Sequence, residues 1–310
     1  MAKAPATERQ IVEELHFRSD NAYLCLLLNR RTRMIRVIDF RAGALPAKRL
    51  FIQSVAQREG VEKVITLVEK DEVSAWTRVG FVREGQIPGF YKRSDGHLLG
   101  CVISEKTASV EVSDEGFKVA ERTINAAKRA ATKIKDTIAG VNLKVVEAKT
   151  AINARDQAWK KGTAVGAFDT FGRGVERFFV ETNMGAKKST SKSKPKSKPK
   201  ANYIAAEFQD CFGHSLIEIL RSPEDDQEIL AVCGALRVIA EELKKRGIVS
   251  AFGFSANNDL ALSTAYVAAG FRKTGLLAHG ILHNGQRRDA ILWTRKLAIP
   301  GDEDKDKFEN

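Results

Sequence analysis

The sequence predicts a mixed α/β protein, an α+β arrangement with a mixed sheet, organised as two similar domains. A chain of 310 residues is long enough for two domains. Short apolar segments alternate with helix-like segments in both halves of the chain, which indicates a sheet covered by helices. The run from Gly80 to Gly100 also has the same layout as the run from Gly270 to Trp293.

The repeat is marked by residues that keep an almost constant offset of 190 positions, or 189 at the turn. The matched pairs are Gly80-Phe81 with Gly270-Phe271, Gly85 with Gly275, Ile87 with Leu277, and the turn at 94–96 with the turn at 283–285. A match over so many positions predicts an internal repeat.

Each copy is predicted to contain strand, helix, strand, helix and hairpin in that order. The first copy has a strand at 34–40, a helix from Pro46 to Gly60, a strand at 63–69 and a helix before Gly80. The second has a strand at 215–220, a helix from Pro223 to Gly247, a strand at 250–256 and a helix before Gly270. Proline suits the first helical turn and glycine the helix end. Short strands at 23–29 and 203–212 precede the copies.

Between the copies, apolar residues from Phe117 to Ile138 recur in steps of three and four, which predicts an amphipathic helix closed by Gly140. Packing on a domain is favoured over a coiled-coil dimer. A strand at 143–148, helices at 154–162 and 170–177, and a strand at 177–183 follow. The predicted parts are an N-terminal domain at 8–105, a connecting helix at 115–140, a C-terminal domain at 141–298 and an acidic tail at 299–310.

Composition limits the class of protein. No apolar run is long enough for a membrane span, and the N-terminus lacks the apolar core of a signal peptide. The four cysteines are widely spaced and form no CxxC pair, so we expect a cytoplasmic protein with reduced thiols and no metal site.

The net charge of +12 is concentrated in one segment. Lys187–Lys200 holds seven lysines and no acid, and subtracting them leaves +5. This composition cannot form a core, so a disordered loop at 186–201 inside the C-terminal domain is predicted. Two interpretations stay open. One is a solvated loop, and the other is weak, non-specific nucleic-acid binding through released counterions.

The order of elements, with a helix reading AxxxxYVAAGF from Ala261 to Phe271, resembles the GNAT acyltransferase superfamily. The segments GFxxEGxIPGFY near residue 80 and KKRGI near residue 244 resemble the beta-lysine N6-acetyltransferase family. That family also has two such halves, with the second being the acetyltransferase. The resemblance implies transfer of an acetyl group from acetyl-CoA to a primary amine.

In this superfamily the turn before the long helix binds the pyrophosphate of coenzyme A through backbone N–H groups. The resemblance implies cofactor contacts at Leu220, Arg221, Ser222 and Asn258. The second copy, however, reads LRSPEDDQE, with no glycine and three acids in a row. We expect Ser222 to cap the helix and Asp225 to occupy the acid position of a capping box. The first copy offers the basic loop Arg41–Arg49.

The resemblance also implies two catalytic roles. Tyr266, four residues before Gly270, is placed to protonate the leaving thiolate, whereas the first copy has Trp76 there. Glu218 is the preferred base for the acceptor amine, ahead of His214 and Glu207.

Two functions are therefore predicted. One is an N-acetyltransferase acting on a small amine or a lysine side chain. The alternative is a catalytically inactive GNAT-fold scaffold whose Lys-rich loop binds nucleic acid or an acidic partner. The sequence does not decide the oligomeric state.

Overall fold

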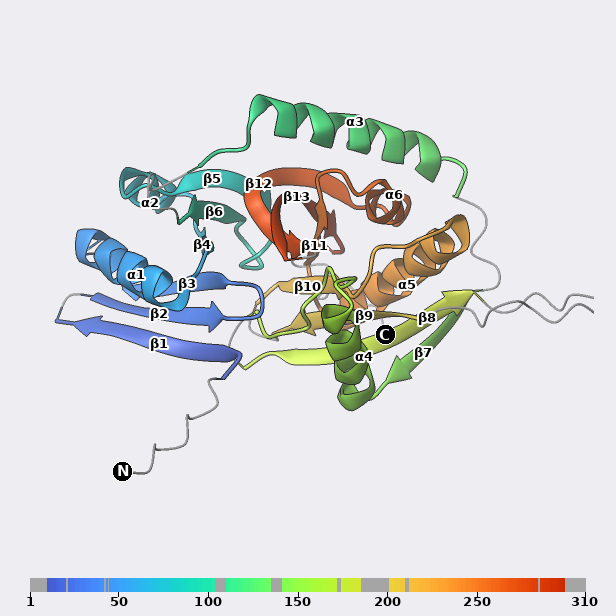
Figure 1. Cartoon of the computed structure of the whole chain (residues 1–310), viewed down its shortest axis with the longest axis horizontal. Coiled ribbons are helices and arrows are strands. Elements are labelled where there is room, and N and C mark those ends of the chain that lie inside the picture. The colour runs from blue at the N-terminus through green and yellow to red at the C-terminus, as the bar shows by residue number, and fades with distance from the viewer. Residues whose placement is uncertain are drawn as a thin grey trace, which may run out of the picture.

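The computed structural model describes residues 10–20, 22–41, 43, 45–103, 110–134, 141–171, 174–184, 201–209, 212–283 and 285–298. Over these residues the chain forms one mixed sheet of 13 strands with six helices packed on it (Figure 1). The strands are β1 Val12–Ser19, β2 Ala22–Asn29, β3 Met34–Arg41, β4 Lys63–Val68, β5 Val82–Ile87, β6 Gly96–Val102, β7 Val141–Val146, β8 Glu176–Met184, β9 Asn202–Phe208, β10 His214–Ile219, β11 Ser250–Ala256, β12 Arg272–His283 and β13 Gln286–Lys296. The helices are α1 Leu45–Glu59, α2 Val73–Arg78, α3 Asp114–Ala131, α4 Ala148–Lys160, α5 Asp226–Lys245 and α6 Leu260–Ala268.

The strand order is β1-β2-β3-β4-β6-β5-β12-β13-β11-β10-β9-β8-β7. Both copies of the sequence repeat follow the same path, since β3-α1-β4-α2-β5-β6 has the same element order as β10-α5-β11-α6-β12-β13. Each copy also has one parallel pair, β3 with β4 and β10 with β11, among antiparallel neighbours. The mixed α/β class and the predicted order of these elements are confirmed.

The matched glycines lie where the two copies meet. Gly85 of β5 pairs with Gly275 of β12, which joins the two halves into one sheet. A Cβ atom on Gly275 would lie 2.7 Å from the Gly85 Cα and 2.5 Å from the Glu84 carbonyl oxygen. Only glycine allows the two backbones to approach so closely, which explains why both copies carry it at the same position.

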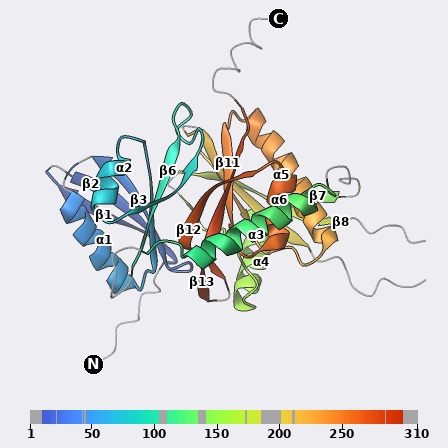
Figure 2. The ribbon, with the colours of Figure 1, turned by 90° about the horizontal axis from the view of Figure 1, so that it is seen from above.

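The helix between the copies packs on the C-terminal half. Ser113 caps α3 by accepting a hydrogen bond from the Gly116 N–H at 3.1 Å. Ala120, Ile124 and Ala131 are buried in the same core as α5 and α6, and α3 lies along α6 in both views (Figures 1 and 2). The buried face of α3 thus packs on the C-terminal half of the chain, and the predicted helix end at Gly140 lies outside the described residues.

The segment preceding β8 differs from the prediction. The helix expected at 170–177 is wrong, since the described residues there form no helix and Arg177 belongs to β8. Gly174 adopts a φ of +57°, a left-handed conformation that interrupts a right-handed helix. The helix expected at 154–162 belongs to α4, which starts earlier, at Ala148.

The Lys-rich segment joins two adjacent antiparallel strands, β8 and β9, which pair from Glu176↔Phe208 to Thr182↔Asn202. Lys187–Lys200 itself and the acidic tail lie outside the described residues. Among the residues that the structure describes, no helix is long and apolar enough to cross a membrane.

Candidate active site

A cavity of about 120 Å³ lies between the two halves of the sheet. The N-terminal half contributes β2, β3 and the turn between them, and the C-terminal half contributes β10, β12 and the segment 165–171. The lining is mainly apolar, and its charged residues are Glu218, Asp169, Arg36 and Arg287. A pocket with apolar walls and a few converging charged groups is the usual form of a small-molecule site.

Strands β10 and β11 separate beside this cavity. Their parallel pairing covers only His214↔Ser250, Ser215↔Ala251 and Leu216↔Phe252. At the next position Gly253 faces Ile217, and a Cβ atom on Gly253 would lie 2.7 Å from the Ile217 carbonyl oxygen. The pairing therefore ends after Leu216, and what we call the gap between the strands is the space beside the Ile217 carbonyl oxygen that Gly253, without a side chain, leaves to another group.

The Tyr266 hydroxyl lies in this gap and donates a 3.4 Å hydrogen bond to the Ile217 carbonyl oxygen. Its ring stacks on Trp293, with centroids 5.9 Å apart, and meets the edge of Phe271 at 5.2 Å. The residue is fully buried. Burial, with a further contribution from the nearby Glu218, raises the pKa of Tyr266 above its ordinary value. Tyr266 is thus a fixed, neutral phenol that retains its proton at neutral pH.

Glu218 lies on β10 and its residue lines the cavity. One carboxylate oxygen accepts a 3.1 Å hydrogen bond from the Ala167 N–H. Burial, followed by repulsion from Glu207, raises the pKa of Glu218 to about 8. A carboxylate with a pKa near neutrality is suited to accept a proton from an amine. Ile217, whose carbonyl oxygen accepts the hydrogen bond from Tyr266, also lines the cavity, whereas Tyr266 itself is fully buried behind that strand and is not part of the lining.

His214 and Glu207 lie apart from the main cavity. They line a smaller pocket of about 10 Å³ that shares Arg36 and Phe171 with the larger one. The His214 ring stacks on Phe90 at 3.6 Å, and burial lowers its pKa to about 3. Glu207 accepts a 2.7 Å hydrogen bond from the Phe171 N–H. Glu218 is therefore the best placed of the three candidate bases.

The loop before α5 satisfies its own N–H groups. Asp225, rather than the expected Ser222, is the N-cap, and it accepts a hydrogen bond from the Glu228 N–H at 2.8 Å. Glu228 in turn accepts one from the Glu224 N–H at 2.9 Å. Because the helix starts three residues later than expected, the Ser222 hydroxyl bonds Asp259 instead, at 2.8 Å. The carboxylates of Asp225 and Glu228 thus accept the hydrogen bonds of two N–H groups at the start of α5.

Of the other residues expected to bind the cofactor, Leu220 and Arg221 are bonded to other groups of the chain and Asn258 is exposed. Leu220 is buried, and its carbonyl oxygen accepts a hydrogen bond from the Val165 N–H at 2.8 Å. The Arg221 side chain is buried and lies 3.2 Å from the Glu224 carboxylate and 3.6 Å from that of Glu228. Asn258 is exposed on the turn before α6, whose N-cap is Asp259. These side chains do not converge on one space.

The first copy fills its corresponding gap. Val37 and Thr66 stand three residues after the start of the parallel β3–β4 pairing, as Ile217 and Gly253 do in the second copy. There the Thr66 hydroxyl bonds the Val37 carbonyl oxygen at 3.3 Å. The fully buried Lys48 also pairs with Asp39 at 2.7 Å near the end of β3. Trp76, the counterpart of Tyr266, is buried against Phe81 and has no ionisable hydroxyl.

Two functional features were not predicted from the sequence. Gly253 was overlooked, although a glycine inside the strand sequence SAFGFSA signals close approach of another group. Asp169 lines the cavity and is bonded by Asn29 at 3.2 Å, Arg31 at 3.0 Å and Arg155 at 3.1 Å, which fixes the segment 165–171 to the N-terminal half. No short motif surrounds Asp169, so no sequence pattern marks it.

No protein-family model matches the chain, and no curated protein has a similar sequence. Similar solved structures include the spermidine N-acetyltransferase from Vibrio cholerae in complex with CoA and spermine. Its sequence is 11% identical, the TM-score is 0.35, and the match covers 52% of this chain and 97% of that one. The ribosomal-protein-S18-alanine N-acetyltransferase from Escherichia coli has 15% identity and a TM-score of 0.33, covering 52% of this chain and 97% of that one.

Proposed function

We propose that the C-terminal half is a GNAT-type N-acetyltransferase unit whose acceptor is a primary amine bound in the cavity between the halves. The observation that carries this proposal is the buried Tyr266 hydroxyl in the gap between β10 and β11, next to the cavity that Glu218 lines. A proton donor and a proton acceptor are the groups that amine acylation requires.

Each side chain has a separate role in this proposal. Acetyl-CoA, when bound, would supply the acetyl thioester. Glu218, in its ionised form, would take a proton from the substrate ammonium group, so that the amine nitrogen can attack. Asp169, which is paired with Arg31 and Arg155, would hold the wall of the cavity in place. Tyr266 would hold the proton that a leaving thiolate needs, and it carries this proton at neutral pH because burial raises the pKa of the phenol.

The end of the site near Tyr266 and the end at the start of α5 differ in how well they could hold acetyl-CoA. The space beside Gly253 is filled by the Tyr266 hydroxyl, so the acyl group would have to approach from the cavity that Ile217 and Glu218 line. The α5 end is occupied by the carboxylates of Asp225 and Glu228. Repulsion between these carboxylates and a pyrophosphate amounts to about a kcal/mol or more per charge at short range. We therefore expect weak binding of acetyl-CoA, which also supports a non-catalytic scaffold as the second candidate function.

We further propose that the chain comprises two GNAT-like domains, at 8–105 and 141–298, and that the first is degenerate. The shared element order supports this division. Thr66 and the Lys48–Asp39 ion pair fill the first domain's gap, which leaves the second domain as the place for catalysis. The first domain then serves as a wall of the acceptor cavity.

The test is an acetylation assay with acetyl-CoA and a panel of polyamines, small amines and lysine peptides, read by mass spectrometry. Tyr266→Phe should lower turnover by roughly 10²–10⁴, the usual contribution of a positioned acid. Tyr203→Phe is the matched control, because its hydroxyl lies on β9 against Glu181, outside the cavity lining. Unchanged turnover in Tyr266→Phe would exclude it as the acid, and no acetylation of any amine would favour the scaffold.

A further inference from the structure

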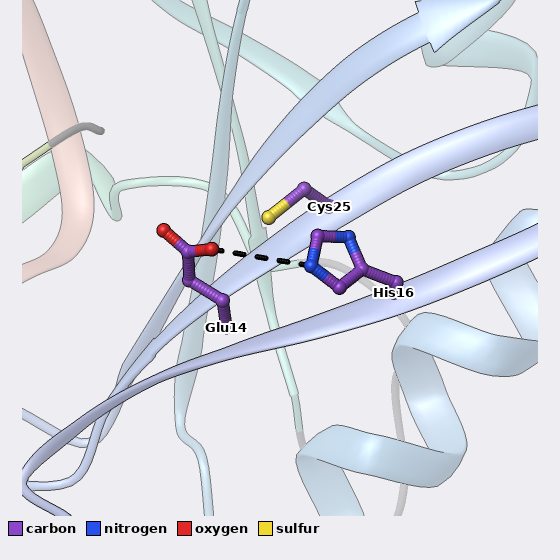
Figure 3. Close-up of side chains that lie close together, drawn as sticks. All are labelled: Glu14, His16 and Cys25. Carbon is purple, nitrogen blue, oxygen red and sulfur yellow. Dashed lines mark ion pairs between the residues drawn. The ribbon is translucent and has the colours of Figure 1, made fainter. Parts of the chain in front are cut away.

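Three potential metal ligands meet at the N-terminal edge of the sheet. Glu14 and His16 lie on β1 and Cys25 lies on β2 (Figure 3). Their carboxylate oxygen, ring nitrogen and sulfur atoms all lie within 4.8 Å of one another. The His16 Nε2 is 3.9 Å from a Glu14 carboxylate oxygen.

The strand register brings these residues together. His16 is directly opposite Cys25 in the antiparallel β1–β2 pair. Glu14 is two residues from His16 on the same strand, so both side chains point to one face of the sheet. The neighbouring Phe17 points to the other face, where its ring packs 5.3 Å from that of Phe51 on α1. The cluster therefore lies on the face opposite α1.

The His16 ring is held in a definite orientation. Its Nδ1 atom is hydrogen bonded to the Tyr23 hydroxyl at 3.3 Å, and the two rings stack with centroids 5.9 Å apart. The same ring presents Nε2 to Glu14. A histidine whose second nitrogen is hydrogen bonded to a neighbouring group is the usual arrangement for a metal ligand, because that bond fixes the ring and the tautomer.

We propose that Glu14, His16 and Cys25 bind a divalent transition metal ion of the zinc type. A set of one oxygen, one nitrogen and one sulfur ligand suits zinc, whereas magnesium and calcium prefer oxygen alone. Bonds of about 2.0–2.3 Å at tetrahedral angles place ligand atoms roughly 3.5 Å apart. The present separations of up to 4.8 Å require the atoms to approach by only about 1 Å. Water would complete the coordination.

Access and proton release both follow from the geometry. The Glu14 and His16 side chains are each 31% exposed, whereas Cys25 is buried, so the ion would enter from solvent and meet the thiol last. As the sulfur–metal bond forms, the Cys25 thiol gives its proton to the solvent, and binding weakens at low pH. The ion would tie β1, an edge strand of the sheet, to β2.

No local sequence motif marks this site. Metal binding was not expected because no CxxC pair is present, but these ligands come from two strands, with eight residues between His16 and Cys25. The pairing register, rather than a local motif, brings them together.

The test uses the full chain, freed of metal with a chelator and titrated with zinc by calorimetry and with cobalt by absorption spectroscopy. We expect micromolar or tighter zinc binding and a thiolate-to-cobalt charge-transfer band. Cys25→Ser should abolish the band. His16→Gln, at an exposed position that should not disturb folding, should weaken zinc binding at least tenfold. Cys233→Ser, a buried thiol on α5 in the other half, is the control and should keep the band.

The cobalt and zinc measurements each have an outcome that would contradict the metal site. A wild-type chain without the cobalt band, or a band that persists in Cys25→Ser, would overturn the proposal. If Cys25→Ser fails to fold by circular dichroism, His16→Gln decides, and unchanged zinc affinity in that variant would count equally against the site. Calorimetry in two buffers of different ionisation heat should also show a proton released on binding by the wild type.

Discussion

Substitution of Gly253 by alanine tests whether the Tyr266 hydroxyl occupies the gap between β10 and β11. The added Cβ atom would overlap this hydroxyl and lie 2.7 Å from the Ile217 carbonyl oxygen and 3.0 Å from the Tyr266 Cζ. Gly253 is not among the residues with positive φ, so alanine adds no backbone strain. The whole cost should therefore come from crowding.

The magnitude can be bounded. Overpacking a well-filled core costs about 1–3 kcal/mol. Replacing glycine by alanine in a permitted conformation recovers about 0.4–1 kcal/mol through the unfolded chain. The free energy of unfolding should thus fall by about 1–2 kcal/mol in Gly253→Ala. Tyr266→Phe alone removes one long hydrogen bond and should cost about 0.5–1.5 kcal/mol.

A double-mutant cycle isolates the contact. Because phenylalanine has no hydroxyl, Gly253→Ala should cost about 1 kcal/mol less in the Tyr266→Phe background than in the wild type. The measurement is urea unfolding of the wild type, both single variants and the double variant. Equal cost of Gly253→Ala in both backgrounds would show that the hydroxyl does not lie against Gly253, and the proposed position of the acid would fail with it.

Three further predictions concern the base, the loop and the seam. Burial raises the pKa of Glu218 to about 8, so activity should rise with pH through about 8, and Glu218→Gln should remove that dependence. The folded state then binds more protons than the unfolded state between about 4.5 and 8, so stability should fall as pH rises through this range, and less so in Glu218→Gln. Combined Asp225→Asn and Glu228→Gln substitutions should tighten acetyl-CoA binding in calorimetry at a stability cost of about 1 kcal/mol; unchanged binding would exclude charge repulsion. Gly275→Ala should lower the free energy of unfolding by about 1–3 kcal/mol, because the added Cβ atom would clash with backbone atoms of β5, which cannot move aside as a side chain can. An unchanged free energy of unfolding would refute the close approach of β5 and β12.

The regular elements of the repeat were predictable because their signals are local. Proline and glycine bracketed α1 and α5, and apolar spacing revealed the buried face of α3. The first strand, VEELHFRS, was missed because charged residues hide its alternation at the sheet edge. The start of α5 was misplaced because Ser222, Asp225 and Asp226 offer several capping registers, and only packing selects among them.

The site was predictable only in part, since its geometry depends on contacts between distant segments. Tyr266 and Glu218 were identified from the sequence, and the structure brings both to the space around Ile217. The cavity itself requires β5 to pair with β12, because that pairing sets the N-terminal half beside β10. No periodicity or motif encodes such a contact between the copies. The catalytic roles of Tyr266 and Glu218 and the binding of acetyl-CoA remain predictions.

The two copies satisfy the corresponding backbone carbonyl in different ways. In the first copy the Thr66 hydroxyl satisfies the Val37 carbonyl oxygen from within the neighbouring strand. In the second copy Gly253 has no side chain, so the equivalent carbonyl of Ile217 is satisfied by Tyr266 from α6. The copies therefore differ at two linked positions, Thr66 against Gly253 and Trp76 against Tyr266. Because tryptophan has no hydroxyl, only the second copy has the phenol to which we assign the role of the acid.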